Sequence, residues 1–130
     1  MDLIAFLPPL EDPAGQPWHQ RLRAGWTAGK VEAYSTLEDL SLRLGRPRGE
    51  PFLLFLHASR QPYLDRLLAL RDLVVGLPLI CVLPDDQPAT LAMGHLLRPR
   101  LLLSQSETPE VIDEVLRKFQ MRVKPSNRIE

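Results

Sequence analysis

The chain has one cysteine, few aromatic residues and no excess of positive or negative charge. Cys81 cannot form a disulfide within the chain, and its apolar neighbours in LPLICVLP predict a buried, unreactive thiol. Lysine plus arginine and aspartate plus glutamate both number 16, so overall charge does not favour nucleic acid as a partner. The scarcity of cysteine predicts a protein of a reducing compartment, which we take to be the cytoplasm.

Long apolar runs and several catalytic motifs are also missing. No run approaches the roughly 18 apolar residues that cross a bilayer, and no basic segment precedes the first apolar run. We therefore expect no membrane span and no targeting segment. The motifs G-x-G-x-x-G, G-x-x-x-x-G-K-[ST] and G-x-S-x-G are absent, and the histidines do not cluster with other metal-ligating residues. The sequence predicts no nucleotide cofactor, no metal site and no hydrolase activity.

Five short apolar segments stand out, and each is followed by a segment with helical character. The predicted strands are residues 3–7, 31–34, 52–56, 78–83 and 100–104. Four of them carry apolar residues at consecutive positions, which is typical of strands buried on both faces. The segment 31–34 is weaker and predicts a sheet edge. This alternation predicts one α/β domain with a parallel sheet between two helical layers.

The segments between the strands carry helical start and stop signals. The predicted helices are residues 16–25, 35–45, 61–76, 87–97 and 108–119. The second begins with a capping box of Ser35 and Glu38 and stops at Gly45. The fourth contains Gly94, which costs about 1 kcal/mol relative to alanine inside a helix. We expect this fourth helix to be the least stable.

The order and spacing of these elements resemble the receiver domain of bacterial response regulators, which has a flavodoxin-like fold with strand order 2-1-3-4-5. The resemblance covers residues 1–120 and includes a last helix that begins ETPEVIDEVLRKF, but no signature motif accompanies it. It implies a single five-stranded parallel sheet in a doubly wound domain. Residues 121–130 lack an apolar period and predict a frayed tail.

The resemblance also identifies the positions at which receivers carry out phosphotransfer. In receivers, an acidic pair after the first strand binds magnesium and an aspartate after the third strand accepts a phosphoryl group. A threonine or serine ends the fourth strand and a lysine ends the fifth. The matching positions here are, in that order, Pro8 with Pro9, His57, Pro84, and Ser104 or Gln105.

None of these positions keeps the residue that the chemistry needs. Proline offers magnesium no side-chain oxygen, and histidine cannot form the acyl phosphate that aspartate forms. The resemblance therefore implies a degenerate receiver that is not an enzyme. A degenerate pocket would remain at this edge of the sheet, formed by Pro8, Pro9, His57, Ser59, Pro84, Asp85, Ser104 and Gln105.

An alternative is a regulator whose acidic site has moved along the chain. Glu11 and Asp12 lie just beyond the two prolines, and Asp85 and Asp86 follow the fourth strand. We favour the simpler interpretation that these are loop carboxylates, because Asp86 lies just before a predicted helix start and the others are typical of solvated loops.

His57 has two interpretations at the end of the third strand. Open α/β sheets bind ligands at the carboxyl ends of their strands, so His57 could sense a proton, a metal or an anion. Alternatively, it fills the space of the lost acidic pocket and hydrogen-bonds to a neighbouring backbone carbonyl. We favour the second interpretation. The first leaves open a small-molecule or anion-binding domain around His57, Ser59, Asp85 and Gln105.

The fourth predicted helix indicates how the domain would act. Receivers signal through their fourth helix, fifth strand and fifth helix. The corresponding segment LAMGHLL has more apolar residues than a helix with one buried face requires. The predicted contact surface consists of Leu91, Met93, Leu96 and Leu97. The alternative is that these side chains pack inward. The leading hypothesis is a phosphorylation-independent interaction module in bacterial regulation, with an unidentified protein partner and a homodimer as one arrangement.

Overall fold

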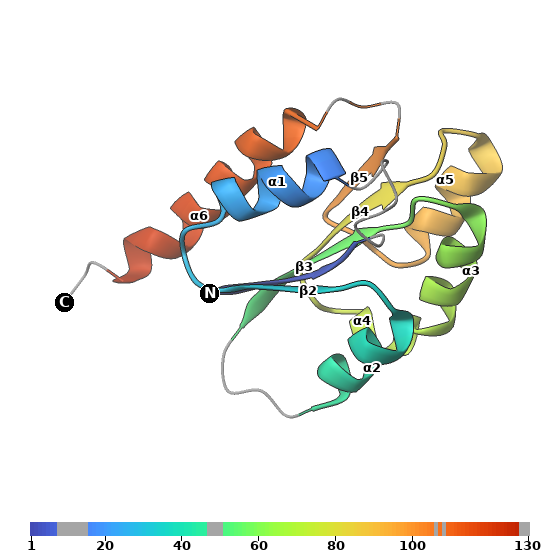
Figure 1. Cartoon of the computed structure of the whole chain (residues 1–130), viewed down its shortest axis with the longest axis horizontal. Coiled ribbons are helices and arrows are strands. Elements are labelled where there is room, and N and C mark those ends of the chain that lie inside the picture. Colours follow the sequence, from blue (N-terminus) through green and yellow to red (C-terminus); the bar gives the residue numbers. More distant parts are fainter. Residues whose placement is uncertain (8–15, 47–50, 106, 108, 128–130) are drawn as a thin grey trace.

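The computed structural model describes residues 1–7, 16–46, 51–105, 107 and 109–127, with the side chains of the last helix described as far as Met121. Its centre is one sheet of five parallel strands in the order β2-β1-β3-β4-β5 (Figure 1). This arrangement confirms the predicted α/β fold, with a doubly wound, flavodoxin-like strand order. No described helix is both long and apolar enough to cross a membrane.

The strands and helices alternate along the chain as predicted. The strands are β1 (Asp2–Phe6), β2 (Val31–Tyr34), β3 (Phe52–His57), β4 (Leu79–Leu83) and β5 (Leu101–Ser104). The helices are α1 (Gln16–Gly25), α2 (Leu37–Gly45), α3 (Gln61–Ala69), α4 (Arg71–Val74), α5 (Pro88–His95) and α6 (Val111–Asn127).

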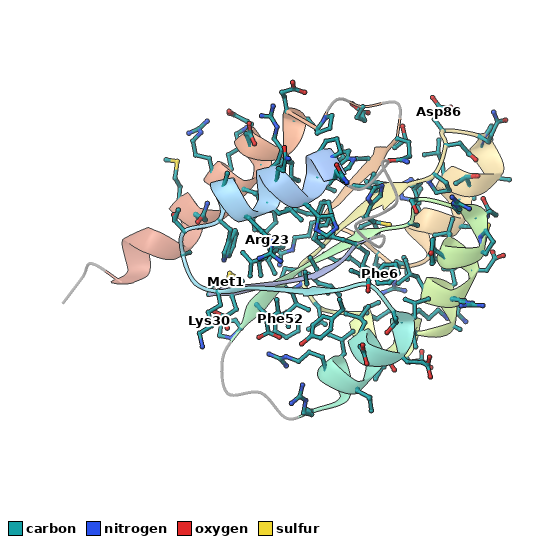
Figure 2. All side chains as sticks on the ribbon, in the orientation of Figure 1. Met1, Phe6, Arg23, Lys30, Phe52 and Asp86 are labelled. Atoms are coloured by element: carbon teal, nitrogen blue, oxygen red, sulfur yellow. The ribbon has the colours of Figure 1, made fainter. Side chains whose placement is uncertain are left out.

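Two apolar cores lie on the two faces of the sheet. Side chains of successive strand residues point to opposite faces, so Phe55 packs toward α1 and α6 while Leu54 packs toward α2, α3 and α5. Trp18 of α1 belongs to the first core and Leu64 of α3 to the second. Figure 1 shows these two helical layers, and Figure 2 shows side chains filling the space between them and the sheet. Every residue of β3 and β4 is buried, as expected for central strands covered on both faces.

The start of α2 and the end of α3 differ from the sequence prediction. The N-cap of α2 is Thr36, not Ser35, because the Thr36 hydroxyl accepts a hydrogen bond from the backbone N–H of Asp39 at 3.2 Å. The predicted helix 61–76 is broken at Leu70, whose φ of −97° and ψ of 8° turn the chain into the short helix α4. The break lets Val74 pack in the same core as the residues of α3.

Helix α6 continues past the predicted start of the tail. It begins at Val111 and runs to Asn127, so residues 121–127 are helical where the sequence predicted a frayed segment. Its last turns extend beyond the end of α1 (Figure 1). Thr108, which would begin the predicted helix, lies outside the described residues.

Gln120 ties α6 to neighbouring segments at the position where the tail was predicted to begin. Its amide oxygen accepts hydrogen bonds from the backbone N–H groups of Thr27 and Ala28 at 2.7 and 2.9 Å, and from the Thr27 hydroxyl at 3.2 Å. Its amide nitrogen donates to the carbonyl oxygens of Gly25 at 2.8 Å and Leu116 at 3.1 Å. One side chain therefore joins α6 to the end of α1 and to the loop before β2, which holds α6 in place at the predicted tail boundary.

Gly94 lies where α5 approaches the sheet. A Cβ atom at this position would meet methyl groups of Leu83 and Leu102 at 3.0 Å. The glycine weakens the helix locally but allows close packing of α5 on β4 and β5.

We expect Gln120→Ala to lower the free energy of unfolding by about 1 kcal/mol, because the partly buried carbonyl of Gly25 and the exposed N–H groups of Thr27 and Ala28 lose this partner. Urea denaturation measures this. The control is Arg117→Ala on the exposed side of α6, for which we expect a smaller loss than for Gln120→Ala, because an exposed ion pair contributes little to stability. Equal stability of the two variants would show that Gln120 does not hold the layer together.

Candidate functional site

The carboxyl ends of β3, β4 and β5 bring together part of the predicted pocket. β3 ends at His57 and β5 ends at Ser104, with Gln105 following directly. The backbone N–H of Ala58 donates to the carbonyl of Val82, and that of Gln105 donates to the carbonyl of Leu83, both at 2.9 Å. These bonds keep the strand ends in register where the chain leaves the sheet.

His57 and Gln105 contact each other across this edge. Nε2 of His57 lies 2.8 Å from the amide oxygen Oε1 of Gln105. Because an amide oxygen only accepts, Nε2 carries the hydrogen in this pair. This partner is a side chain 48 positions away in the sequence, whereas the sequence-based interpretation named a neighbouring backbone carbonyl.

The His57 ring lies in the core on the α1 side of the sheet. It is 0% exposed, and its centroid is 5.6 Å from that of Trp18 at an interplanar angle of 53°. The position follows from strand alternation, because His57 points to the same face as Leu53 and Phe55. A phosphodonor in solution has no direct access to a ring with this burial.

The other described pocket residues have mixed roles. Asp85 accepts a hydrogen bond at Oδ1 from the backbone N–H of Gln87 at 3.0 Å, and so shapes the turn into α5. The Ser59 hydroxyl is buried and has no hydrogen-bond partner in the described part of the chain. Ser104 is buried at the end of β5, and Pro84 is half-buried after β4.

Several residues important to the predicted chemistry lie outside the described residues. These are Pro8, Pro9, Glu11 and Asp12. Within the described ranges, no three histidine, cysteine, aspartate or glutamate side chains are placed to hold a metal ion. Asp86 is exposed at the loop before α5 (Figure 2).

Cys81 lies on β4 in the core, as predicted from its neighbours. Burial raises the pKa of its thiol to about 12, since the thiolate would lose its hydration there. The thiol is therefore protonated at neutral pH and is not a nucleophile.

The predicted contact surface on α5 is only partly exposed. Leu97 is 0% exposed and belongs to the core, so its assignment to the surface is wrong. Leu91 and Met93 are half-buried against the same core, and only Leu96 is largely exposed, at 52%. The reason is the close approach of α5 to the sheet at Gly94, which brings neighbouring apolar side chains inward.

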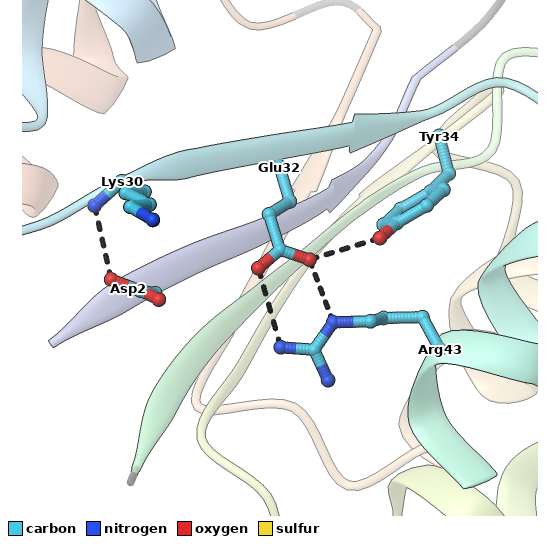
Figure 3. Close-up of polar contacts among 5 residues, drawn as sticks. All are labelled: Asp2, Lys30, Glu32, Tyr34 and Arg43. Atoms are coloured by element: carbon cyan, nitrogen blue, oxygen red, sulfur yellow. Dashed lines mark hydrogen bonds and ion pairs between the residues drawn. The ribbon is translucent and has the colours of Figure 1, made fainter. Parts of the chain in front are cut away.

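A polar cluster at the opposite edge of the sheet was missed by sequence reasoning (Figure 3). Arg43 of α2 donates from Nε and Nη2 to the two carboxylate oxygens of Glu32 on β2, at 2.7 and 3.3 Å. The Tyr34 hydroxyl donates to Glu32 at 2.9 Å. The hydrogen bonds from Arg43 lower the pKa of the Glu32 carboxyl. An acidic residue within the predicted edge strand was the one available signal, and its partner was not evident from the sequence.

No protein-family model, curated protein or solved structure matches the chain. The function therefore has to be inferred from the strand order and from the geometry at the strand ends.

We expect Glu32→Gln to lower stability at pH 7 by about 1–3 kcal/mol, because Arg43 then lacks its charged partner. The folded-state pKa of Glu32 is lowered, so its contribution is present above the usual glutamate value of 4.5 and is lost as pH falls through the folded value. The difference between wild type and variant should therefore shrink at low pH, measured by urea denaturation at pH 7 and pH 3.

The control for this experiment is Asp72→Asn, which removes an exposed carboxylate on α4. We expect its stability to stay within about 0.5 kcal/mol of wild type at pH 7. A Glu32→Gln difference that stays constant between the two pH values would contradict the ion-pair assignment.

Proposed function

We propose that the chain is a receiver-like interaction module that acts in bacterial regulation without phosphorylation. The observation that carries this proposal is the burial and hydrogen bonding of His57. It occupies the strand end at which receivers carry their acceptor, yet it is 0% exposed and donates to Gln105. A group held this way supports a structural role and not a chemical one.

Phosphoryl transfer needs an accessible nucleophile and compensation of the phosphoryl charge. The imidazole of His57 is covered by Trp18 and its Nε2 carries the hydrogen that Gln105 accepts. The lone pair then lies on Nδ1, which is also buried, so attack by either ring nitrogen would require the ring to leave the core. The pocket therefore favours a fixed arrangement over a phosphorylation switch.

The rest of the proposal follows from the loss of that switch. The module would act by binding a protein, with a homodimer as one arrangement, and would need no cofactor, nucleic acid or membrane. We place it in the cytoplasm, consistent with a single buried cysteine. Such a protein regulates through surface complementarity alone.

A second candidate function is anion or small-molecule binding at the same strand ends. The buried Ser59 hydroxyl, without a hydrogen-bond partner in the described part of the chain, favours it. Helix α3 begins two residues later, and Arg60 makes no side-chain hydrogen bond to its first turn. Pro62 has no N–H and the N–H of Tyr63 donates to the carbonyl of Arg60, so the Ser59 hydroxyl is the group at this helix start that would contact an anion.

We expect no phosphoryl adduct when the protein is incubated with acetyl phosphate and Mg²⁺ and analysed by intact mass spectrometry. The physical reason is the burial of His57. A competent receiver labelled in parallel shows that the phosphodonor is active, and His57→Ala identifies any labelling at this position. An adduct on wild type would overturn the proposal, and one that persists in His57→Ala would indicate a displaced acidic site.

Thermal unfolding in increasing inorganic phosphate tests the second candidate. If the protein is an interaction module that binds no anion, phosphate should change the melting temperatures of wild type and of Ser59→Ala by the same small amount. A ligand at 100 times its dissociation constant stabilises the folded state by about 2.7 kcal/mol. A phosphate-dependent rise in melting temperature that is lost in Ser59→Ala would favour anion binding instead.

A further inference from the structure

The two edges of the sheet are protected differently. β2 carries a charged residue within its length, Glu32, which is bound by Arg43. β5 has the residues Leu101, Leu102, Leu103 and Ser104, so no charged side chain lies within it. In the described sheet β5 pairs with β4 alone. Natural edge strands usually carry charges, prolines or bulges that prevent further pairing, and β5 lacks the first two.

A small hollow lies beside this edge, between β5 and α6. Its apolar lining comes from Leu101 on the strand and from Val115 and Phe119 on the helix. The volume is about 170 Å³. Small-molecule sites usually enclose about 300–1,000 Å³. The hollow is therefore better matched to one apolar side chain than to a cofactor.

The rim of the hollow is basic. Arg100 and Lys118 complete its lining, and the Lys118 side chain is 66% exposed. Lys118 forms an exposed ion pair with Glu114, whose carboxylate oxygen lies 4.0 Å from the Lys118 nitrogen. An exposed pair at this distance contributes little, so it leaves the rim able to attract carboxylates.

We propose that β5 and this hollow bind an extended, acidic and apolar segment of a partner protein by strand addition. The backbone of the segment would pair with the outer side of β5. One apolar side chain would enter the hollow and a carboxylate would meet Arg100 and Lys118. A second copy fits less well, since its β5 offers no carboxylate. This inference deepens the proposed function and rests on it by naming the kind of partner.

The test is an NMR titration of isotope-labelled protein with a synthetic peptide, acetyl-Glu-Val-Leu-Val-Glu-amide. We expect shifts of amide signals on β5 and at Phe119, with affinity falling as salt rises. A peptide with lysine in place of both glutamates tests charge. A third, with N-methyl groups on alternate backbone nitrogens, cannot form the strand hydrogen bonds and should not bind.

Surface variants test the basic rim. We expect the double variant Arg100→Glu with Lys118→Glu to weaken binding of the acidic peptide by about tenfold or more. The control Arg66→Glu lies on α3, in the layer on the other face of the sheet, and should bind as wild type does. Circular dichroism and melting temperature show that each variant is folded.

Any of four results would overturn the inference. One is the absence of shifts on β5 at millimolar peptide, or equal binding of the lysine peptide. Another is a peptide footprint on α5 instead of β5. The last is self-association by sedimentation with concentration-dependent β5 signals, which would mean that a second copy occupies the edge. A phosphoryl adduct would refute the proposed function, whereas a failed titration without an adduct refutes only this inference.

Discussion

Burial of β3 on both faces is the constraint on which the rest of the structure depends. A parallel strand in the middle of a sheet must be covered by two helical layers, and its side chains alternate between them. Phe55 therefore packs under α1 and α6, while Leu54 and Leu56 pack under the other layer. The same alternation sends His57 into the α1 side, where a polar ring needs both a hydrogen-bond partner and close packing.

Gln105 supplies a partner for one ring nitrogen, and Trp18 packs against the ring. The amide oxygen accepts from the imidazole, and the indole covers the ring. The interaction ties the end of β3 to the residue after β5, although β4 lies between the two strands. A strand-end region built in this way is a fixed part of the core.

The layer of α1 and α6 links this core to the exposed edge at β5. Gln120 joins α6 to the end of α1, and Arg21 of α1 forms ion pairs with Glu110 and Asp113 near the start of α6. These contacts hold α6 between its start and Gln120, and side chains of the same stretch, Val115 and Phe119, form one wall of the hollow beside β5. At the opposite edge, Glu32 of β2 forms an ion pair with Arg43 of α2. The two sides of one sheet therefore differ in what they can bind.

The strands, the helical layers and the parallel arrangement could be predicted from the sequence, because short apolar runs and helical spacing are local patterns. The sequence also identified His57 and Gln105 as strand-end residues, but not their contact. The tertiary structure alone decided that contact, the burial of Leu97, the length of α6 and the partners of Gln120, which lies 95 positions from Gly25. Local periodicity says which side of an element is apolar. It cannot say which distant polar group completes a hydrogen bond, because that depends on how the packed layers bring remote segments together.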